Sequence, residues 1–188
     1  MEAARKLEAR YTYADYCAWP NDKRWELIDG KAYALAAPSL GHQRASGEVF
    51  RQLSNFLLGK PCQVFSAPCD VRLDADGDDG DVVQPDILVV CDSKKLEDGK
   101  SVVGAPDLIV EVLSPSTATH DLIRKLLLYQ RSGVREYWVA DIDSKLMYIN
   151  VLRDGRYSGS AYSHDNAAVP VEVLDGCTIN LVKVFEGL

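Results

Sequence analysis

The stretch PDLIVEVL, residues Pro106–Leu113, decides the fold, because it is an apolar run with a glutamate inside it. Short apolar runs of this kind are typical of strands that are covered on both faces of a sheet. A carboxylate there is costly unless it is paired, hydrogen-bonded or bound to a metal ion. Glu111 therefore needs a partner: a metal ion, or an arginine or lysine in a buried ion pair.

A second apolar run, VQPDILVV at Val83–Val90, supplies the acid that could share a metal ion with Glu111. Asp107 lies four residues before Glu111, which is about 13 Å along a strand at ~3.3 Å per residue. That is too far for one ion that holds its oxygen ligands at about 2.1 Å. Asp86 is on another strand, and neighbouring strands lie ~4.8 Å apart. The geometry favours Asp86 with Glu111; Asp107 is expected to start its strand or form a turn, which is also the alternative for Asp86.

A helix is expected from about Ala118 to Arg131, directly after the Glu111 strand. Asp121, Lys125 and Tyr129 are spaced i, i+4, i+8 and so share one side of it. One interpretation is an Asp121–Lys125 surface ion pair worth about 0.3–0.5 kcal/mol. The other follows from topology: the helix could pack over the strand and bring Lys125 to the site.

The remaining pattern indicates an α/β protein with a central mixed sheet, flanking helices and extra strands at both ends. Asp29-Gly30 predicts a hairpin turn, and Ser39 is a helix N-cap for a helix reaching about Leu58. His42 lies on the apolar side of that helix. It could bond a ligand or a phosphate, or serve as a structural histidine. The strand, helix and strand from Pro106 to Ala140 should form a right-handed crossover between parallel strands.

The composition is that of a globular protein, with 188 residues, 47% hydrophobic and 26% charged. We expect one domain over residues 1–188, with a core at about 25–150. No apolar run approaches the ~20 residues of a membrane helix, and the N-terminus lacks the apolar part of a secretory signal. A cytoplasmic protein without membrane attachment is therefore expected.

The net charge and the cysteines reduce the number of possible functions further. The formal net charge of −7 counts against a broad basic surface for phosphates, so any nucleic-acid contact must be local or shared between subunits. Five cysteines without a Cys-x-x-Cys pair argue against a zinc site. Reduced and mostly buried thiols are expected.

Taken together, these motifs resemble the Uma-type restriction endonucleases, a family of the PD-(D/E)XK nuclease superfamily. The resemblance covers about Trp25 to Tyr148, which is most of the chain. The matching segments are residues 26–30, 38–42, 84–90, 104–116 and 133–138, together with Asp121, Lys125 and Tyr129.

The resemblance implies a restriction-endonuclease-like fold and metal-dependent hydrolysis of phosphodiester bonds, with Mg²⁺ or Mn²⁺ as cofactor and DNA as substrate. It makes Asp86 and Glu111 the metal ligands and, with Lys125, the catalytic residues. The superfamily usually has its lysine two residues after the second acid, where this chain has Leu113. Auxiliary roles are expected for His42, Asp121 and Tyr129.

Three functions of different classes follow. The first is an active endodeoxyribonuclease, expected as a homodimer because two-fold dimers are the commonest assembly and two sites suit two DNA strands. The second is a catalytically inactive nuclease-like domain that binds nucleic acid or a protein partner, motivated by Leu113 and the acidic charge. The third is another metal-dependent hydrolase on the same scaffold, since a fold does not fix the substrate.

Overall fold

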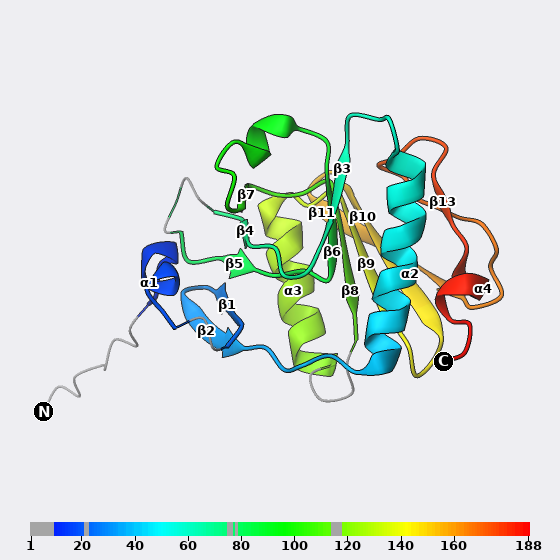
Figure 1. Cartoon of the computed structure of the whole chain (residues 1–188), viewed down its shortest axis with the longest axis horizontal. Coiled ribbons are helices and arrows are strands. Elements are labelled where there is room, and N and C mark those ends of the chain that lie inside the picture. The colour runs from blue at the N-terminus through cyan, green and yellow to red at the C-terminus, as the bar shows by residue number, and fades with distance from the viewer. Residues whose placement is uncertain (1–9, 21–22, 75–76, 78, 114–117) are drawn as a thin grey trace, which may run out of the picture.

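The computed structural model describes residues 10–20, 23–74, 77, 79–113 and 118–188. Its centre is a six-stranded sheet in the order β11-β10-β9-β8-β6-β3 (Figure 1). Only β8 and β9 run parallel, and the other neighbours are antiparallel, so the expected mixed sheet is confirmed. The strands are β3 (Gln63–Ser66), β6 (Ile87–Val90), β8 (Leu108–Val112), β9 (Glu136–Asp141), β10 (Leu146–Arg153) and β11 (Arg156–Ser163).

Two helices cover opposite faces of this sheet. Helix α2 (Leu40–Leu57) packs Ala45, Val49 and Leu53 against one face, together with the C-terminal part of the chain. Helix α3 (Ala118–Ser132) packs against the other face. It connects the parallel strands β8 and β9, so the expected crossover between parallel strands is present. Period-two alternation along β8 therefore sends alternate side chains toward α2 and toward α3.

A second, smaller sheet lies on the α3 side of the central sheet and shares its core. Its order is β2-β1-β5-β4-β7, with β1 (Trp25–Ile28), β2 (Lys31–Ala34), β4 (Val71–Arg72), β5 (Val82–Val83) and β7 (Val102–Val103). The sequence predicted one continuous strand over Val83–Val90, and this was wrong. The run divides at Gln84-Pro85, because proline has no N–H to continue a ladder. Asp86 follows immediately, where the chain enters the central sheet.

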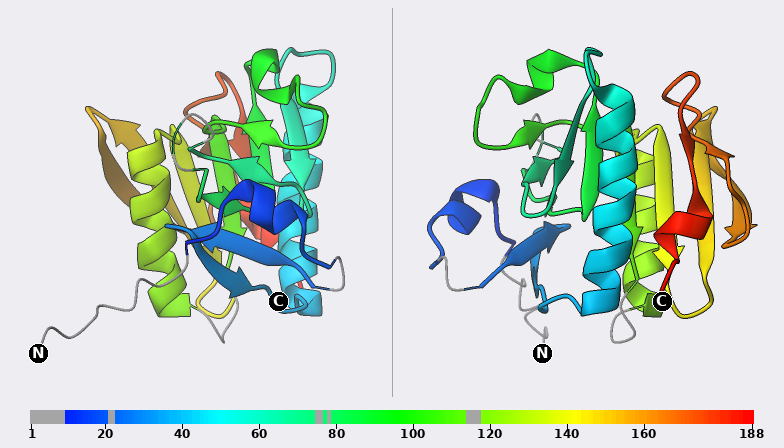
Figure 2. Two further views of the ribbon diagram at one scale, coloured as in Figure 1. Left: turned by 90° about the vertical axis from the view of Figure 1, so that its left-hand side faces the viewer. Right: turned by 45° about the vertical axis from the view of Figure 1, so that its right-hand side comes forward.

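The β1–β2 hairpin carries one wall of the site described below. Asp29 (φ 52°) and Gly30 (φ 71°) form the predicted tight turn, and Trp25 pairs with Ala34 at its open end. Helix α1 (Tyr13–Cys17) precedes the hairpin, and Thr12 caps it. Viewed from the side, the hairpin lies between α3 and α2 (Figure 2, left).

The remaining elements lie outside the site. They are the 3-10 helix η1 (Ser93–Leu96), the strands β12 (Val169–Pro170) and β13 (Thr178–Ile179), and helix α4 (Leu181–Val184). The sequence predicted strands in this C-terminal region but not α4. Within the described part of the chain, no helix combines the length and the apolar character needed to cross a membrane.

The cysteines differ from expectation. Cys62 and Cys91 form a disulfide across the β3–β6 pair, where the register already places Gln63 opposite Val90. Of the free thiols, Cys177 is buried and Cys17 is exposed. The expectation of reduced thiols was therefore wrong for Cys62 and Cys91, and the expectation of burial was wrong for Cys17. The reason is geometric: two cysteines far apart in sequence become direct cross-strand neighbours.

Replacing Gly30 by alanine should destabilise the hairpin more than the same change at Gly155, the glycine of a second Asp-Gly turn. Both have positive φ, 71° and 76°, so both variants carry the left-handed cost of about 1–2 kcal/mol. A Cβ on Gly30 would lie 3.0 Å from Cβ and 3.3 Å from Cα of Arg10, whereas nothing lies within 4 Å at Gly155. Urea unfolding of both variants measures the difference.

We expect Gly30→Ala to cost about 1 kcal/mol more than Gly155→Ala, the low end of overpacking costs. The entropy that alanine removes from the unfolded chain is the same in both and cancels. Equal destabilisation by the two changes would show that Arg10 moves away from the new Cβ without a cost in free energy.

Candidate active site

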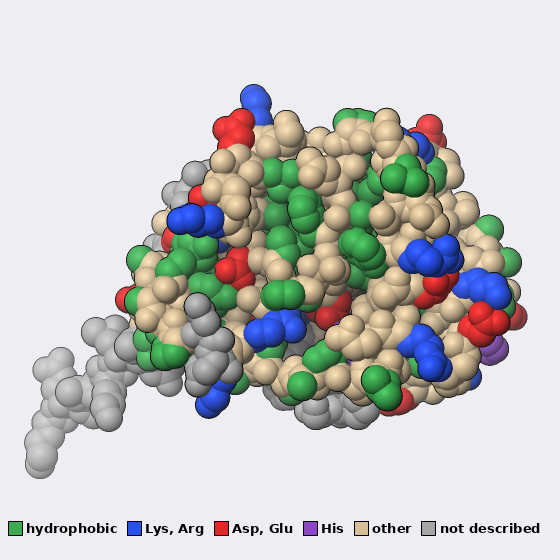
Figure 3. Space-filling view, in the orientation of Figure 1, with side chains coloured by type: hydrophobic (Ala, Val, Ile, Leu, Met, Phe, Trp, Pro, Cys, Tyr) green, Lys and Arg blue, Asp and Glu red, His purple; other side chains and the backbone are tan. Residues whose placement is uncertain are grey.

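A cavity of about 670 Å³ lies between the β1–β2 hairpin, the N-terminal half of α2 and the edge of the central sheet. Figure 3 shows this face of the molecule, hollowed between hydrophobic side chains, with acidic and basic side chains close together. Most of the residues of interest line the cavity: Arg24, Glu26, His42, Gln84, Asp86, Glu111 and Lys125.

Asp86 and Glu111 come together because of the β6–β8 register. Ile87 lies opposite Val110, so one step outward along this antiparallel pair places Asp86 opposite Glu111. Directly opposite residues project to the same face of a sheet. The Asp86 side chain confirms the closeness, since its Oδ2 accepts the backbone N–H of Val112 at 2.8 Å. The structure thus brings the two predicted acids to one wall of the cavity.

Asp86 is held by two donors from different elements. His42 Nε2, from the first turn of α2, lies 3.0 Å from Asp86 Oδ2, the oxygen that also accepts from Val112. Ser39 accepts the His42 backbone N–H and so fixes where that turn begins. Burial lowers the pKa of His42, but the hydrogen bond to Asp86 and the charges of Asp86 and Glu111 outweigh it and raise the pKa overall.

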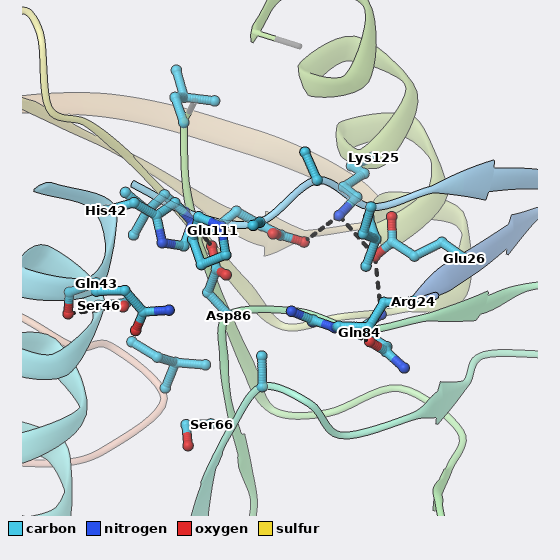
Figure 4. Close-up of a pocket in the computed structure, with 18 of the residues that line it drawn as sticks. Arg24, Glu26, His42, Gln43, Ser46, Ser66, Gln84, Asp86, Glu111 and Lys125 are labelled. Carbon is cyan, nitrogen blue, oxygen red and sulfur yellow. Dashed lines mark hydrogen bonds and ion pairs between the residues drawn. The ribbon is translucent and has the colours of Figure 1, made fainter. Parts of the chain in front are cut away.

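Glu111 is held by α3. Its Oε1 accepts from Lys125 Nζ at 2.9 Å (Figure 4). The same oxygen accepts from Tyr129 Oη at 2.7 Å, and Tyr129 lies one helical turn after Lys125. Lys125 Nζ also donates to Glu26 Oε1 at 2.9 Å. The side chains of Lys125 and Glu26 are 13% and 4% exposed, so this is a buried ion triad. The helix thus brings Lys125 to the Glu111 strand, as the topology suggested, and the buried ion pair considered as an alternative for Glu111 is present.

The triad leaves the site with excess negative charge. Burial raises the pKa of Glu111 to about 7; the Lys125 charge opposes this, and the charges of Asp86 and Glu26 add to it. Burial lowers the pKa of Lys125, but the charges of Glu111 and Glu26 raise it overall above its ordinary value. A cation placed among these acids would therefore be favoured by the electrostatics.

Two further aspartates complete the comparison with the sequence. Asp107 lies away from the cavity, where Oδ2 accepts the Cys91 N–H and Oδ1 the Arg135 Nη1. It therefore begins its strand, as predicted. Asp121 belongs to α3, but its side chain lies outside the described residues, so its auxiliary role stays a prediction. Lys125 is buried against the two glutamates, so the expected alternative of a surface Lys125 was wrong.

Sequence reasoning missed Glu26, Gln84 and Arg24. Glu26 is buried in β1, where it accepts from Lys125 and from the Gln84 backbone N–H at 2.9 Å. Gln84 accepts at its Oε1 from Arg24 Nε at 2.7 Å. Glu26 carried the same signal as Glu111, an acid within a short apolar strand (WELI). Gln84 and Arg24 carried no comparable signal, because polar residues at strand ends are common.

The donor set fits magnesium or manganese better than zinc. Both described contacts of Asp86 end on Oδ2, and both of Glu111 end on Oε1, so one oxygen of each accepts from no other described residue. Mg²⁺ commonly takes one or two protein carboxylates and fills its shell with water and phosphate oxygens. The described residues contain no group of three His, Cys, Asp or Glu that could hold a metal by themselves.

The mixed central sheet with its flanking helices is a restriction-endonuclease-like fold. Residues 13–182 match the Uma2 family, described as "Putative restriction endonuclease". Since the match covers most of the sequence, the chain belongs to the Uma2 family, as the resemblance implied.

Two further proteins are similar to this chain, one in structure and one in sequence. A crystal structure from Anabaena variabilis, described as "a putative nuclease belonging to DUF820", has a TM-score of 0.73 at 19% identity, covering 93% of this chain and 97% of that one. This likeness concerns the fold. The uncharacterized protein slr1290 of Synechocystis is 31% identical over 119 residues, which are 61% of this chain and 60% of that protein. The match thus spans about 60% of that relative.

Removing the Lys125 charge should destabilise the fold, because Glu26 and Glu111 would be buried without a cation. Breaking a buried ion pair from one side costs about 3–5 kcal/mol, and we expect Lys125→Met to fall in that range at pH 8. Without the lysine charge, which opposes the effect of burial, the folded-state pKa of Glu111 lies further above its ordinary value. The folded state then binds protons more tightly than the unfolded chain, so stability falls as pH rises above about 4.5.

Urea unfolding at pH 5 and pH 8 measures this, and the deficit of Lys125→Met should be clearly larger at pH 8. Lys183→Met is the matched control, because Lys183 is exposed and pairs only with Glu186 among the described residues. If the loss of unfolding free energy is the same at both pH values, the ionisation of the two carboxylates does not depend on Lys125.

Proposed function

We propose that this chain is a metal-dependent endonuclease that hydrolyses phosphodiester bonds in DNA. The observation that carries the proposal is the placement of Asp86 opposite Glu111 on one cavity wall, with Lys125 Nζ 2.9 Å from Glu111. Family membership supports the nuclease class, and the cavity provides room for a strand segment.

Asp86 and Glu111 are the residues that would hold Mg²⁺ or Mn²⁺ through their remaining oxygens. When bound, such an ion lowers the pKa of a water molecule and polarises a phosphoryl oxygen. The protein's own contribution begins with orientation. His42 and the Val112 N–H fix Asp86, and Tyr129 fixes Glu111, so neither acid has to reorganise when substrate arrives.

Lys125 is proposed to position the attacking water. An ammonium group has three donors, and two of them are used on Glu26 and Glu111. The third can donate to a water or to a phosphate oxygen in the cavity. In this proposal Lys125, on helix α3, has the role of the lysine that the superfamily usually carries two residues after the second acid. This chain has Leu113 at that position. Asp121, one turn before Lys125, retains its expected auxiliary role within this proposal.

Cleavage of supercoiled plasmid DNA with MgCl₂ or MnCl₂ tests the proposal. The unaltered protein should nick or linearise the plasmid, and EDTA should stop it. Asp86→Asn and Glu111→Gln should each lower the rate at least about 100-fold, because each removes a metal ligand. The matched control is Asp107→Asn, which changes the other Pro-Asp aspartate, on the neighbouring strand and outside the cavity.

Urea unfolding must first show that all three variants are folded. Equal cleavage by Glu111→Gln and the unaltered protein would mean that the activity does not come from this site.

Metal binding can be measured separately from cleavage by calorimetric titration with Mn²⁺. We expect binding in the millimolar range or tighter for the unaltered protein and for Asp107→Asn, and none for Asp86→Asn, which loses one of only two carboxylates. No binding to the unaltered protein would favour the second candidate, an inactive nuclease-like domain that binds nucleic acid or protein. The observation in favour of that candidate is that Lys125 is already engaged by two carboxylates.

The proposal includes a homodimer, because cleavage of both DNA strands is simplest with two sites related by a two-fold axis. Sedimentation analysis of the purified chain would distinguish a dimer from a monomer. A monomer that linearises plasmid would require successive nicking instead.

A further inference from the structure

Arg24 is directed to the cavity by the hairpin. It directly precedes β1, and its carbonyl accepts the Leu35 N–H at 2.9 Å, which extends the β1–β2 register by one pair. By strand alternation it shares a face with Glu26, and both residues line the cavity. Figure 4 shows Arg24 alongside Gln84, in the same part of the cavity as Asp86.

Gln84 holds the guanidinium through a fixed network. Its Oε1 accepts from Arg24 Nε at 2.7 Å, while its Nε2 donates to Tyr16 Oη at 2.9 Å and to Asp70 Oδ1 at 2.8 Å. Tyr16 also donates to Asp70 at 2.8 Å. Every polar atom of the Gln84 amide is therefore used, and the amide cannot rotate away. The network reaches α1, so an element remote from the acids fixes the Arg24 side chain.

The described hydrogen-bond partner of Arg24 is neutral, and this distinguishes Arg24 from Lys125. Among the described residues no Asp or Glu forms an ion pair with Arg24, and its described side-chain hydrogen bond uses only Nε. Lys125, by contrast, is compensated by Glu26 and Glu111. Arg124 lies over the Tyr33 ring, 4.4 Å from its centroid, and has further interactions. The two terminal nitrogens of the Arg24 fork thus make no described hydrogen bond.

We propose that Arg24 binds a phosphodiester group of the DNA strand in the cavity, with Gln84 as its positioning residue. The inference rests on the proposed function and assigns a substrate contact within it. A guanidinium binds phosphate through two parallel hydrogen bonds, and it keeps its charge at every pH of interest. A neutral amide at Nε orients this fork without cancelling its charge. A carboxylate in the same place would have removed the attraction for phosphate.

Binding of a short fluorescein-labelled DNA duplex in MgCl₂ tests the proposal. Cleavage is suppressed by using Glu111→Gln as the parent protein. In that background Arg24→Gln should weaken binding about tenfold and reduce the salt slope of log K by about 0.9, the value of one phosphate contact. Arg24→Lys should retain the slope and lose affinity several-fold, because a point charge replaces the fork.

Arg153→Gln is the matched control. It removes the same charge from an exposed arginine of β10 that pairs with Glu172, and it should leave affinity and slope unchanged. Identical binding by Arg24→Gln and Arg153→Gln would overturn the inference. If Arg24→Gln does not fold, Arg24→Lys decides: affinity equal to that of the parent overturns the inference.

The same experiments separate this inference from the proposed function. If the unaltered protein cleaves plasmid in a Glu111-dependent way while Arg24→Gln binds like its parent, the function stands and the Arg24 contact fails. If the unaltered protein neither binds nor cleaves DNA, the proposed function fails, and the Arg24 contact fails with it.

Discussion

The ammonium group of Lys125 is the interaction on which the rest of the site depends. It connects β8, through Glu111, and α3, which carries the lysine, to the distant strand β1 through Glu26. Burying three ionised groups is expensive, and such a triad contributes little to stability compared with apolar packing. Its effect is positional. It fixes the small sheet against the central sheet at the point where the cavity opens, and it fixes Glu111 beside Asp86.

The sequence contained most of what decides the central sheet. Apolar runs bounded by turns predicted β6, β8 and β9, and the helical stripe predicted α2. Glu111 was identifiable because an acid within such a run must have a partner, and strand spacing alone selected Asp86 over Asp107. These inferences succeeded because they use local periodicity and fixed distances, which are properties of one segment or of two adjacent strands.

What the sequence could not provide depends on contacts between distant segments. Nothing near Cys62 indicates that Cys91 lies opposite it, since the β3–β6 register is a property of the whole sheet. The two parts of Val83–Val90 looked like one strand because both are apolar, and they belong to different sheets because Pro85 ends the first ladder. Glu26 could have been noticed from its apolar neighbours, but its partner Lys125 is ninety-nine residues away.

The charges of the cavity suggest how an acidic chain could bind a polyanion. With a formal net charge of −7, the protein as a whole repels DNA, so attraction must be generated locally. The charge of Lys125 is more than cancelled by its two glutamates, which leaves excess negative charge in the cavity that Asp86 and Arg24 also line. If the proposed function holds, a divalent cation held by Asp86 and Glu111 would neutralise the negative charge of that cavity wall. The charge of Arg24 would then add to the attraction for DNA. Affinity for DNA would therefore depend on how far the negative charge of this wall is neutralised, by a bound cation or by removal of a carboxylate charge.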